Sequence, residues 1–166
     1  SQIPLFVAVD QEGGIISRVP WVESASQGTL QSAEQAFLVG ERRGQELQEL
    51  GINMNLAPVL DSGNSEDFLF ERIFQKNEVK SSEYARSLIL GHMESGVVSV
   101  VKHYPGYDGI LKNPELQTIP RRPEFPDTNV FEHLFSQAAA PFLMLSHVIY
   151  EDTDKQYPLV LSAAGM

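Results

Sequence analysis

Short apolar runs alternate with amphipathic stretches along the whole chain. The first run, 5–9, is continuous and apolar, which is typical of a strand buried on both faces. Further strands are expected at 52–57, 97–101 and 141–145. The periodicity between the strands predicts three helices.

Polar and glycine residues mark the ends of these helices. The first begins at an N-cap Ser32 and ends at Gly51, with apolar positions Ala36, Phe37, Val39 and Leu47. The second is expected to be capped by Ser81 or Ser82 and to run to Glu94 before Gly96, with Tyr84, Leu88 and Leu90 mainly inward. The third covers Asp127 to Ala139.

Alternation of strands and helices at this spacing predicts parallel βα units, with right-handed crossovers that place the helices outside. Each strand is followed by polar residues, namely Asp10, Asn55, Lys102-His103 and Ser146-His147. In a βα barrel the functional site lies at these C-terminal strand ends. A doubly wound open sheet gives a similar pattern, but no glycine-rich phosphate loop follows the first strand.

Composition and charge limit the classes of partner that this chain could bind. The 166 residues suffice for one domain, and the formal net charge of −10 argues against nucleic acid and anionic membrane surfaces. An uncharged ligand such as a sugar is compatible with that charge. The absence of cysteine excludes disulfides and thiolate metal sites and permits a reducing compartment. No apolar run approaches the ~18 residues of a membrane span, and no signal peptide precedes the first strand.

These observations slightly favour a cytoplasmic location. The chain begins immediately before a strand, which suggests that the N-terminus is trimmed.

Two segments carry candidate binding groups near the first two strands. In Asp10-Gln11-Glu12-Gly13-Gly14 the glycines let the backbone approach a ligand, and Asp10 could accept hydrogen bonds from sugar hydroxyls. A solvated acidic turn explains the same residues about as well. Arg18 and Arg72 could each fork two donors onto adjacent oxygens, although either one alone fits a surface arginine.

The third strand ends in Lys102-His103-Tyr104-Pro105-Gly106, the most specific local pattern in the chain. Buried Lys and His side chains must be paired or must bind something, although a core histidine bonded to backbone is the alternative for His103. Ser146-His147 repeats this arrangement one βα unit later, without the glycine elbow of a serine hydrolase. No histidine pair has the i, i+4 spacing of helical metal ligands, so His103 and His147 do not suggest a metal site.

Together these segments resemble glycoside hydrolase family 3, in particular its bacterial β-N-acetylhexosaminidase branch. The resemblance rests on five elements in the family order, which span nearly the whole chain: Val9 to Gly14 with Arg18, Asn55 to Asp61, Glu71-Arg72-Ile73-Phe74, Lys102 to Gly106, and Ser146 to Tyr150 with Pro158 to Ser162.

The resemblance implies a TIM-type (β/α)8 barrel, of which residues 1–166 form one partial domain covering about the second to fifth βα units. It implies an O-glycosyl hydrolase that retains configuration, through a carboxylate nucleophile and an acid/base group. It implies no metal or organic cofactor. The matching residues Asp10, Arg18, Arg72, Lys102 and His103 would hold the sugar, and His147 is a further candidate for substrate binding.

Two departures from the family pattern concern catalysis. The family's Asp-His acid/base pair aligns without gaps on Asn113 and Glu115. Asn cannot exchange a proton near neutral pH, whereas Glu115 could if burial raised its pKa, and Asp108 is a second candidate. The simpler interpretation is that the pair is absent.

The family nucleophile follows the last matching stretch and lies beyond Met166, so we expect no glycosidase activity from this segment alone. A partial barrel would also leave strand edges and an apolar core open, which predicts that the segment comes from a longer protein or self-associates. The expected function of the parent is β-N-acetylhexosaminidase-like or β-glucosidase-like hydrolysis in carbohydrate metabolism. The alternative is a catalytically degenerate member that binds a glycan without hydrolysing it.

Overall fold

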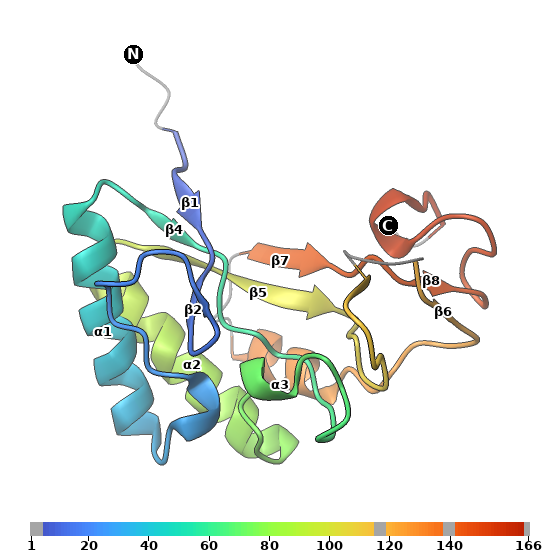
Figure 1. Cartoon of the computed structure of the whole chain (residues 1–166), viewed down its shortest axis with the longest axis horizontal. Coiled ribbons are helices and arrows are strands. Elements are labelled where there is room, and N and C mark those ends of the chain that lie inside the picture. The colour runs from blue at the N-terminus through green and yellow to red at the C-terminus, as the bar shows by residue number, and fades with distance from the viewer. Residues whose placement is uncertain (1–4, 115–118, 138–141, 165–166) are drawn as a thin grey trace.

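A parallel sheet of four strands, in the order β1–β4–β5–β7, lies at the centre of the structure, a computed structural model that describes residues 5–114, 119–137 and 142–164. Its strands are β1 (Ala8–Val9), β4 (Met54–Asn55), β5 (Val98–Tyr104) and β7 (Phe142–Leu145). Helices α1 (Ala33–Glu49), α2 (Glu78–Glu94) and α3 (Asn129–Ser136) lie on one face of this sheet (Figure 1). The predicted parallel βα arrangement with outer helices is therefore confirmed.

Short elements connect these units. The segment after β1 forms an antiparallel hairpin of β2 (Gln11–Gly13) and β3 (Ile16–Ser17), and β6 (Arg121–Arg122) pairs in parallel with β8 (Ile149–Tyr150). Single 3-10 turns are formed by η1 (Gln27–Thr29), η2 (Phe70–Arg72) and η4 (Leu159–Leu161). None of the helices in the described residues is long and apolar enough to cross a membrane.

The helix boundaries follow from local capping. Ser32 Oγ accepts a hydrogen bond from Gln35 N at 3.1 Å, which confirms the predicted start of α1. The predicted start of α2 at Ser81 or Ser82 is wrong, because Asn77 Oδ1 accepts from Lys80 N at 3.0 Å and begins the helix one turn earlier. Both helices are followed by a glycine with positive φ, Gly51 at 76° and Gly96 at 74°, as expected.

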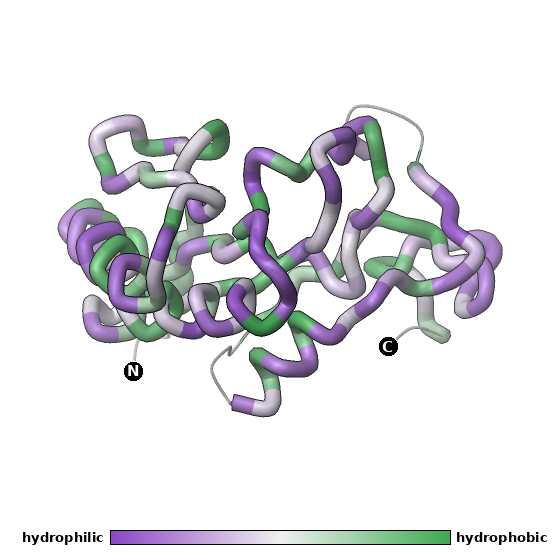
Figure 2. Tube along the Cα trace, turned by 90° about the horizontal axis from the view of Figure 1, so that it is seen from below, coloured by the Kyte–Doolittle hydropathy of each residue, from purple (hydrophilic) through white to green (hydrophobic). Residues whose placement is uncertain are grey.

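The main core lies between the sheet and the helices. Its buried residues include Ala36 of α1, Leu88 and Ile89 of α2, Val101 of β5 and Phe131 of α3. Along the tube in Figure 2, seen from the helix side, hydrophobic and hydrophilic positions alternate as they do in amphipathic helices. On α2, Ile89 is fully buried and Leu90 only half-buried, so the predicted inward position is off by one residue.

Close contact between α1 and α2 depends on two glycines. A Cβ at Gly40 would lie 2.2 Å from Leu88 O, and one at Gly91 would lie 2.3 Å from Phe37 O. No larger residue fits at either position unless the helices separate, so these glycines fix how closely the two helices pack.

The face of the sheet opposite the helices is open along the edge strands β1 and β7 in the described residues, whereas β5 is buried on both faces. Leu5, Phe6 and Val7 are 77%, 59% and 48% exposed, so the prediction of a strand buried on both faces is wrong for 5–9. The physical reason is that β1 is an edge strand with no described segment over this face. Phe6 and Phe142 make an edge-to-face ring contact at 5.6 Å. Because they come from opposite edges of the sheet, this contact indicates that the sheet curves strongly.

One buried histidine joins α2 to the sheet. His92 is fully buried and its Nδ1 lies 2.8 Å from Ser99 Oγ of β5. Burial, assisted by the charge of Arg43, lowers the pKa of His92 to about 3. The ring is therefore neutral in the folded protein, whereas in the unfolded chain it binds a proton below about pH 6.5.

We expect this histidine to make folding stability depend on pH. Between about pH 6.5 and 3 the unfolded state binds one more proton at His92, so stability falls as the pH falls, by about 2 kcal/mol between pH 6.5 and 5. Urea unfolding of the protein and of His92→Gln at several pH values isolates this contribution, because the carboxylates are the same in both. If the unfolding free energy of the two proteins depended on pH in the same way, the proposed contribution of His92 would be contradicted.

Candidate functional site

The hairpin after β1 directs two carboxylates toward the same side. Asp10 and Glu12 are two positions apart in extended chain, so their side chains share a face, and Gln11 between them points the other way. Gln11 is fixed by the amide of Asn55, which donates to Gln11 O at 2.9 Å and accepts from Gln11 N at 3.0 Å. Gly13 has φ 87°, and a Cβ there would lie 2.1 Å from Ala25 O. Glycine is therefore required directly after Glu12.

Glu12 is the centre of a buried charge network. Its carboxylate accepts from Arg72 Nε and Nη2, both at 2.8 Å, and Lys102 Nζ lies 2.5 Å from Glu12 Oε1. The same Lys102 ammonium donates to Asp10 Oδ1 at 2.6 Å. Lys102 is 2% exposed and Glu12 1%, whereas the Asp10 side chain is 37% exposed. Asp10 is therefore the acid of this network that can reach a ligand.

A second acid organises the loop after β5. Asp61 Oδ2 lies 2.8 Å from His103 Nδ1 and accepts from His103 N at 3.0 Å, while Asp61 Oδ1 accepts from Tyr107 N at 2.7 Å. The Tyr107 ring packs edge-on against His103 at 4.9 Å, and its hydroxyl accepts from His147 N at 2.8 Å. These contacts hold the loop against the ends of β5 and β7. A hydrogen bond between His103 Nδ1 and the carboxylate leaves Nε2 as the ring nitrogen available to a ligand.

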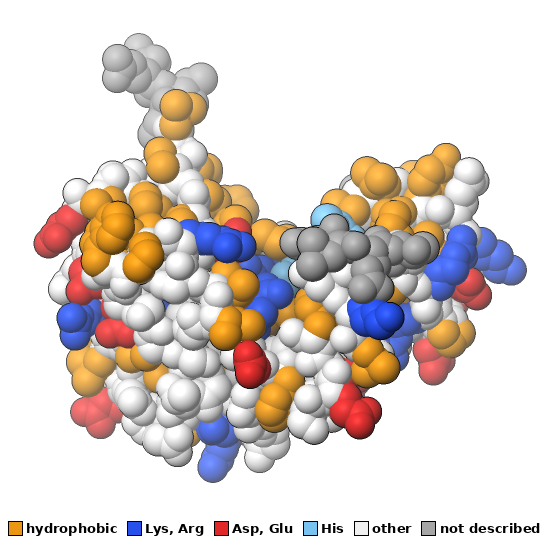
Figure 3. All heavy atoms as spheres, viewed as in Figure 1, with side chains coloured by type: hydrophobic (Ala, Val, Ile, Leu, Met, Phe, Trp, Pro, Cys, Tyr) orange, Lys and Arg blue, Asp and Glu red, His pale blue; other side chains and the backbone are white. Residues whose placement is uncertain are grey.

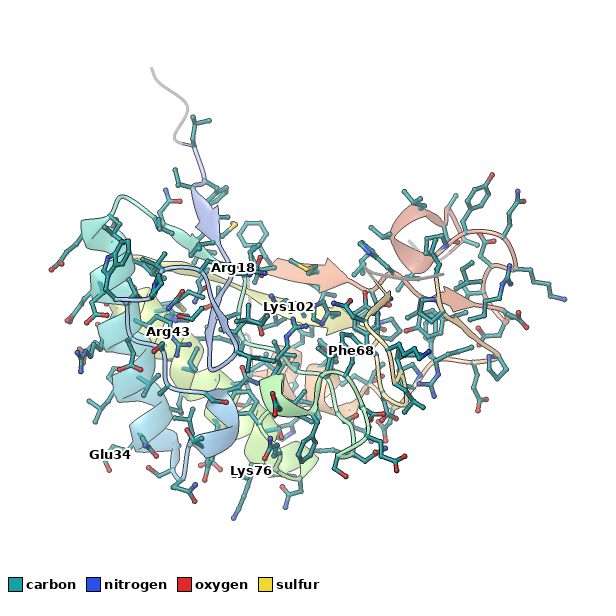
Figure 4. The ribbon with its side chains drawn as sticks, in the orientation of Figure 1. Arg18, Glu34, Arg43, Phe68, Lys76 and Lys102 are labelled. Carbon is teal, nitrogen blue, oxygen red and sulfur yellow. The ribbon has the colours of Figure 1, made fainter. Side chains whose placement is uncertain are left out.

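The charged groups of the Glu12 network, together with His103 and Tyr107, line one cavity of about 280 Å³ at the C-terminal strand ends, comparable to a small-ligand site. Its lining comprises Asp10, Glu12, Ile16, Arg18, Arg72, Lys102, His103, Tyr107, Asn113, Met144, Leu145 and His147. Figure 3 shows a hollow between the body of the molecule and its C-terminal part, with histidine, lysine and arginine atoms along it. In Figure 4, Lys102 lies on the sheet and Arg18 above it.

The cavity wall is strongly polar. Two carboxylates, Asp10 and Glu12, face three permanent cations, Arg18, Arg72 and Lys102. Because most of these charges neutralise each other, the wall offers fixed donors and acceptors without a large net field. Such a wall suits a neutral polyhydroxylated ligand, whose hydroxyl groups both donate and accept hydrogen bonds.

All six predicted binding residues line this cavity: Asp10, Arg18, Arg72, Lys102, His103 and His147. Neither candidate acid/base residue is among the residues that line the cavity in the described structure. Asp108 is half-buried on the loop after β5 and is absent from the lining, and Glu115 lies outside the described residues. Asn113, at the position where the family pattern has an acid, does line the cavity.

Sequence reasoning missed three residues that build the site: Glu12, Asp61 and Tyr107. Glu12 lies two positions after Asp10, and the period of an extended chain would have placed both on one face. Asp61 ends the Asn55 to Asp61 element, but only the fold brings it to His103. Among the described residues no group of three or more His, Asp or Glu side chains is arranged to hold a metal ion.

The family assignment follows from comparison with known proteins. The model for the glycosyl hydrolase family 3 N-terminal domain matches residues 1–166. The chain belongs to glycosyl hydrolase family 3. It is 33% identical over 168 residues to a β-hexosaminidase of Haemophilus influenzae and 31% identical over 168 residues to one of Histophilus somni. Each match covers 92% of this chain and 48% of the relative, so the chain spans about half the length of these curated relatives.

Solved structures of the family share the fold. A family 3 β-N-acetylglucosaminidase from a Paenibacillus species superposes with a TM-score of 0.87 at 26% identity, covering 99% of this chain and 34% of that one. LpqI from M. tuberculosis gives a TM-score of 0.82 at 27% identity, covering 98% and 50%. The four-stranded sheet with outer helices is thus part of the TIM-type barrel of this family, and in the described residues the barrel is open.

We expect Glu12→Gln to destabilise the protein by about 3–5 kcal/mol, because it takes away a buried charge that the buried Lys102 and the partly buried Arg72 share. The shape of the side chain is kept, so the loss reports the charge. Glu151→Gln is the matched control, since Glu151 pairs with Arg121 at 3.1 Å with both side chains about half exposed. That change should cost at most about 1 kcal/mol. Equal effects of the two changes in urea unfolding would contradict the role of Glu12.

Proposed function

We propose that this chain is the sugar-binding part of a retaining β-glycoside hydrolase that acts on N-acetylhexosamine-type substrates, with β-glucosides as the related possibility. The observation that carries the proposal is the convergence of Asp10, Arg18, Arg72, Lys102 and His103 on one cavity. Asp10 and Arg18 flank hairpin β2–β3, Arg72 ends the turn η2, and Lys102 and His103 lie in strand β5. The fold alone brings these elements together. The β-hexosaminidase names of the curated relatives support the substrate class.

In this proposal each residue has a distinct task. Asp10, the most exposed acid of the network, accepts hydrogen bonds from sugar hydroxyls, and Lys102, which is bonded to it, acts as a donor. Arg18 at the cavity wall and His103, oriented by Asp61, supply further donors or acceptors. His147 faces the same cavity from the end of β7. Residues 1–166 then act as one partial barrel domain.

Hydrolysis with retention requires a carboxylate nucleophile and a group that protonates the leaving oxygen and then activates water. Glu115 and Asp108 stay as proposals for the second group. We place the nucleophile outside this segment, so the activity belongs to the whole protein. No step of this mechanism calls for a cofactor.

A second function is favoured by one specific observation. Asn113 lines the cavity where the family pattern has an acid, and an amide cannot transfer a proton near neutral pH. A member of the family that binds a glycan without hydrolysing it fits this wall equally well. The two functions differ in turnover and agree on binding.

Replacing Asp10 tests the site itself. We expect Asp10→Asn to weaken N-acetylglucosamine binding about tenfold or more, since hydrogen bonds to a charged group contribute about 1.5–3 kcal/mol. Calorimetric titration of this chain gives the affinity, with Asp152→Asn on an exposed turn as the control. Unchanged affinity in Asp10→Asn would overturn the site assignment.

Turnover of a chromogenic β-N-acetylglucosaminide by the whole protein, slowed in Glu115→Gln or Asp108→Asn, would favour the hydrolase over the binding protein.

The open face of the sheet suggests what else the chain contacts. Leu5, Phe6, Phe142 and Leu143 are between 36% and 77% exposed on or beside the edge strands β1 and β7. An apolar face of this kind is a site for association. We propose that further barrel strands of a longer chain cover it, and that the 166-residue segment alone self-associates through it.

We expect the isolated segment to sediment above its monomer mass of 18.5 kDa. Phe6→Ser together with Phe142→Ser should shift it toward the monomer, because the change takes away an apolar contact on this face. Sedimentation equilibrium measures the mass. A well-behaved monomer with a cooperative melt would contradict the proposal.

A further inference from the structure

Arg43 of helix α1 is a charged residue at 0% exposure, among the largest fully buried side chains in the described structure. Its hydrogen-bond acceptors are backbone carbonyls: Nε donates to Glu23 O at 3.0 Å, Nη1 to Glu12 O at 3.0 Å and Nη2 to Ala25 O at 2.9 Å. Burial lowers the pKa of Arg43 to about 10, and nearby Glu23, Glu12 and Glu46 oppose that shift. The side chain therefore stays a cation at neutral pH.

The three carbonyls come from the two ends of the segment that joins β1 to α1. Glu12 lies in β2, before the hairpin turn, whereas Glu23 and Ala25 follow the hairpin. A planar guanidinium presents several donors at fixed angles, so one side chain can join three acceptors that the chain brings together. In Figure 4, Arg43 lies beside α1, on the side that faces the hairpin.

The packing around these bonds leaves little freedom. A Cβ at Gly13 would lie 2.8 Å from Arg43 Nη2 as well as 2.1 Å from Ala25 O, so the chain directly after Glu12 rests on the guanidinium and on its acceptor. Helix α1 holds the same segment at a second point, because the Glu46 carboxylate accepts from Glu23 N. Loss of the Arg43 donors would leave one buried carbonyl, Glu12 O, and two partly buried carbonyls without these partners.

Glu12 is thus held at both ends. Its main-chain carbonyl is bound by Arg43, and its carboxylate is bound by Arg72 and Lys102, which line the cavity. Arg43 itself does not line the cavity. A shift of the Glu12 backbone would move the carboxylate, and the two cations that depend on it would lose their positions.

We propose that Arg43 is a positioning residue of the binding site: by holding the Glu12 carbonyl it sets where the Glu12 carboxylate meets Lys102 and Arg72, and so fixes the shape of the cavity. The inference rests on the proposed sugar site for its effect on affinity. Its structural part, the link from Arg43 through Glu12 to Arg72, is independent of any ligand. Arg43→Lys keeps the positive charge but loses the planar set of guanidinium N–H donors, whereas Arg43→Met loses both.

The test follows the Nε–H resonance of Arg72 by ¹H–¹⁵N NMR in the 166-residue chain without ligand, because this proton is bonded to Glu12. We expect the resonance to shift and to exchange faster with solvent in Arg43→Lys, and more so in Arg43→Met. N-acetylglucosamine affinity should fall in the same order, by about tenfold in the methionine variant. Leu134→Ala, which opens a buried site in the main core on α3, is the control for general destabilisation and should leave the Arg72 resonance unchanged.

An unchanged Arg72 resonance in Arg43→Lys, or an equal change in Leu134→Ala, would overturn the inference and reduce Arg43 to a residue that only stabilises the fold. If Arg43→Met does not fold, the lysine variant and its circular dichroism spectrum decide. If the unmodified chain binds no sugar, the proposed function fails, while the Arg72 resonance still tests the link. The two failures are therefore distinguishable.

Discussion

The carboxylate of Glu12, shared by Lys102 and Arg72, is the interaction on which the site depends. It joins hairpin β2–β3, turn η2 and strand β5, which are far apart in the sequence. Removing these charges from water is costly, and the network recovers that cost only if every donor and acceptor is closely placed. The network therefore constrains geometry more than it adds stability, and the exposed Asp10 is held in place through Lys102.

The rest of the fold supplies that geometry. Parallel strands place their carboxyl ends at the same edge of the sheet. Residues at the ends of β1, β5 and β7 therefore meet there, although they are far apart in the sequence. The close packing of α1 against α2 at Gly40 and Gly91 sets where α1 lies beneath the hairpin. The buried Asn55 then ties β4 to Gln11, which orients the carboxylates on either side of it. The site is thus held from below by helices and strands.

Much of this arrangement follows from the sequence. Helical periodicity, the Ser32 cap and the glycines at 51 and 96 predict α1 with both of its ends and the C-terminal end of α2, because these signals are local. Asn77 was missed as the cap of α2 because Ser81 and Ser82 also fit the cap pattern. The exposure of 5–9 could not be predicted, since an apolar run shows that a strand prefers burial and not whether a neighbour covers it.

The six binding residues could be found because they directly follow strands or belong to family elements, whereas Glu12, Asp61 and Arg43 act through partners that only the fold supplies. A crystal structure of the chain with N-acetylglucosamine tests the central claim most directly. The account predicts a sugar in the cavity, with hydroxyls within hydrogen-bond distance of Asp10 and Lys102 and with the Glu12 network intact. A sugar bound elsewhere, or bound in the cavity without contact to Asp10, would contradict it.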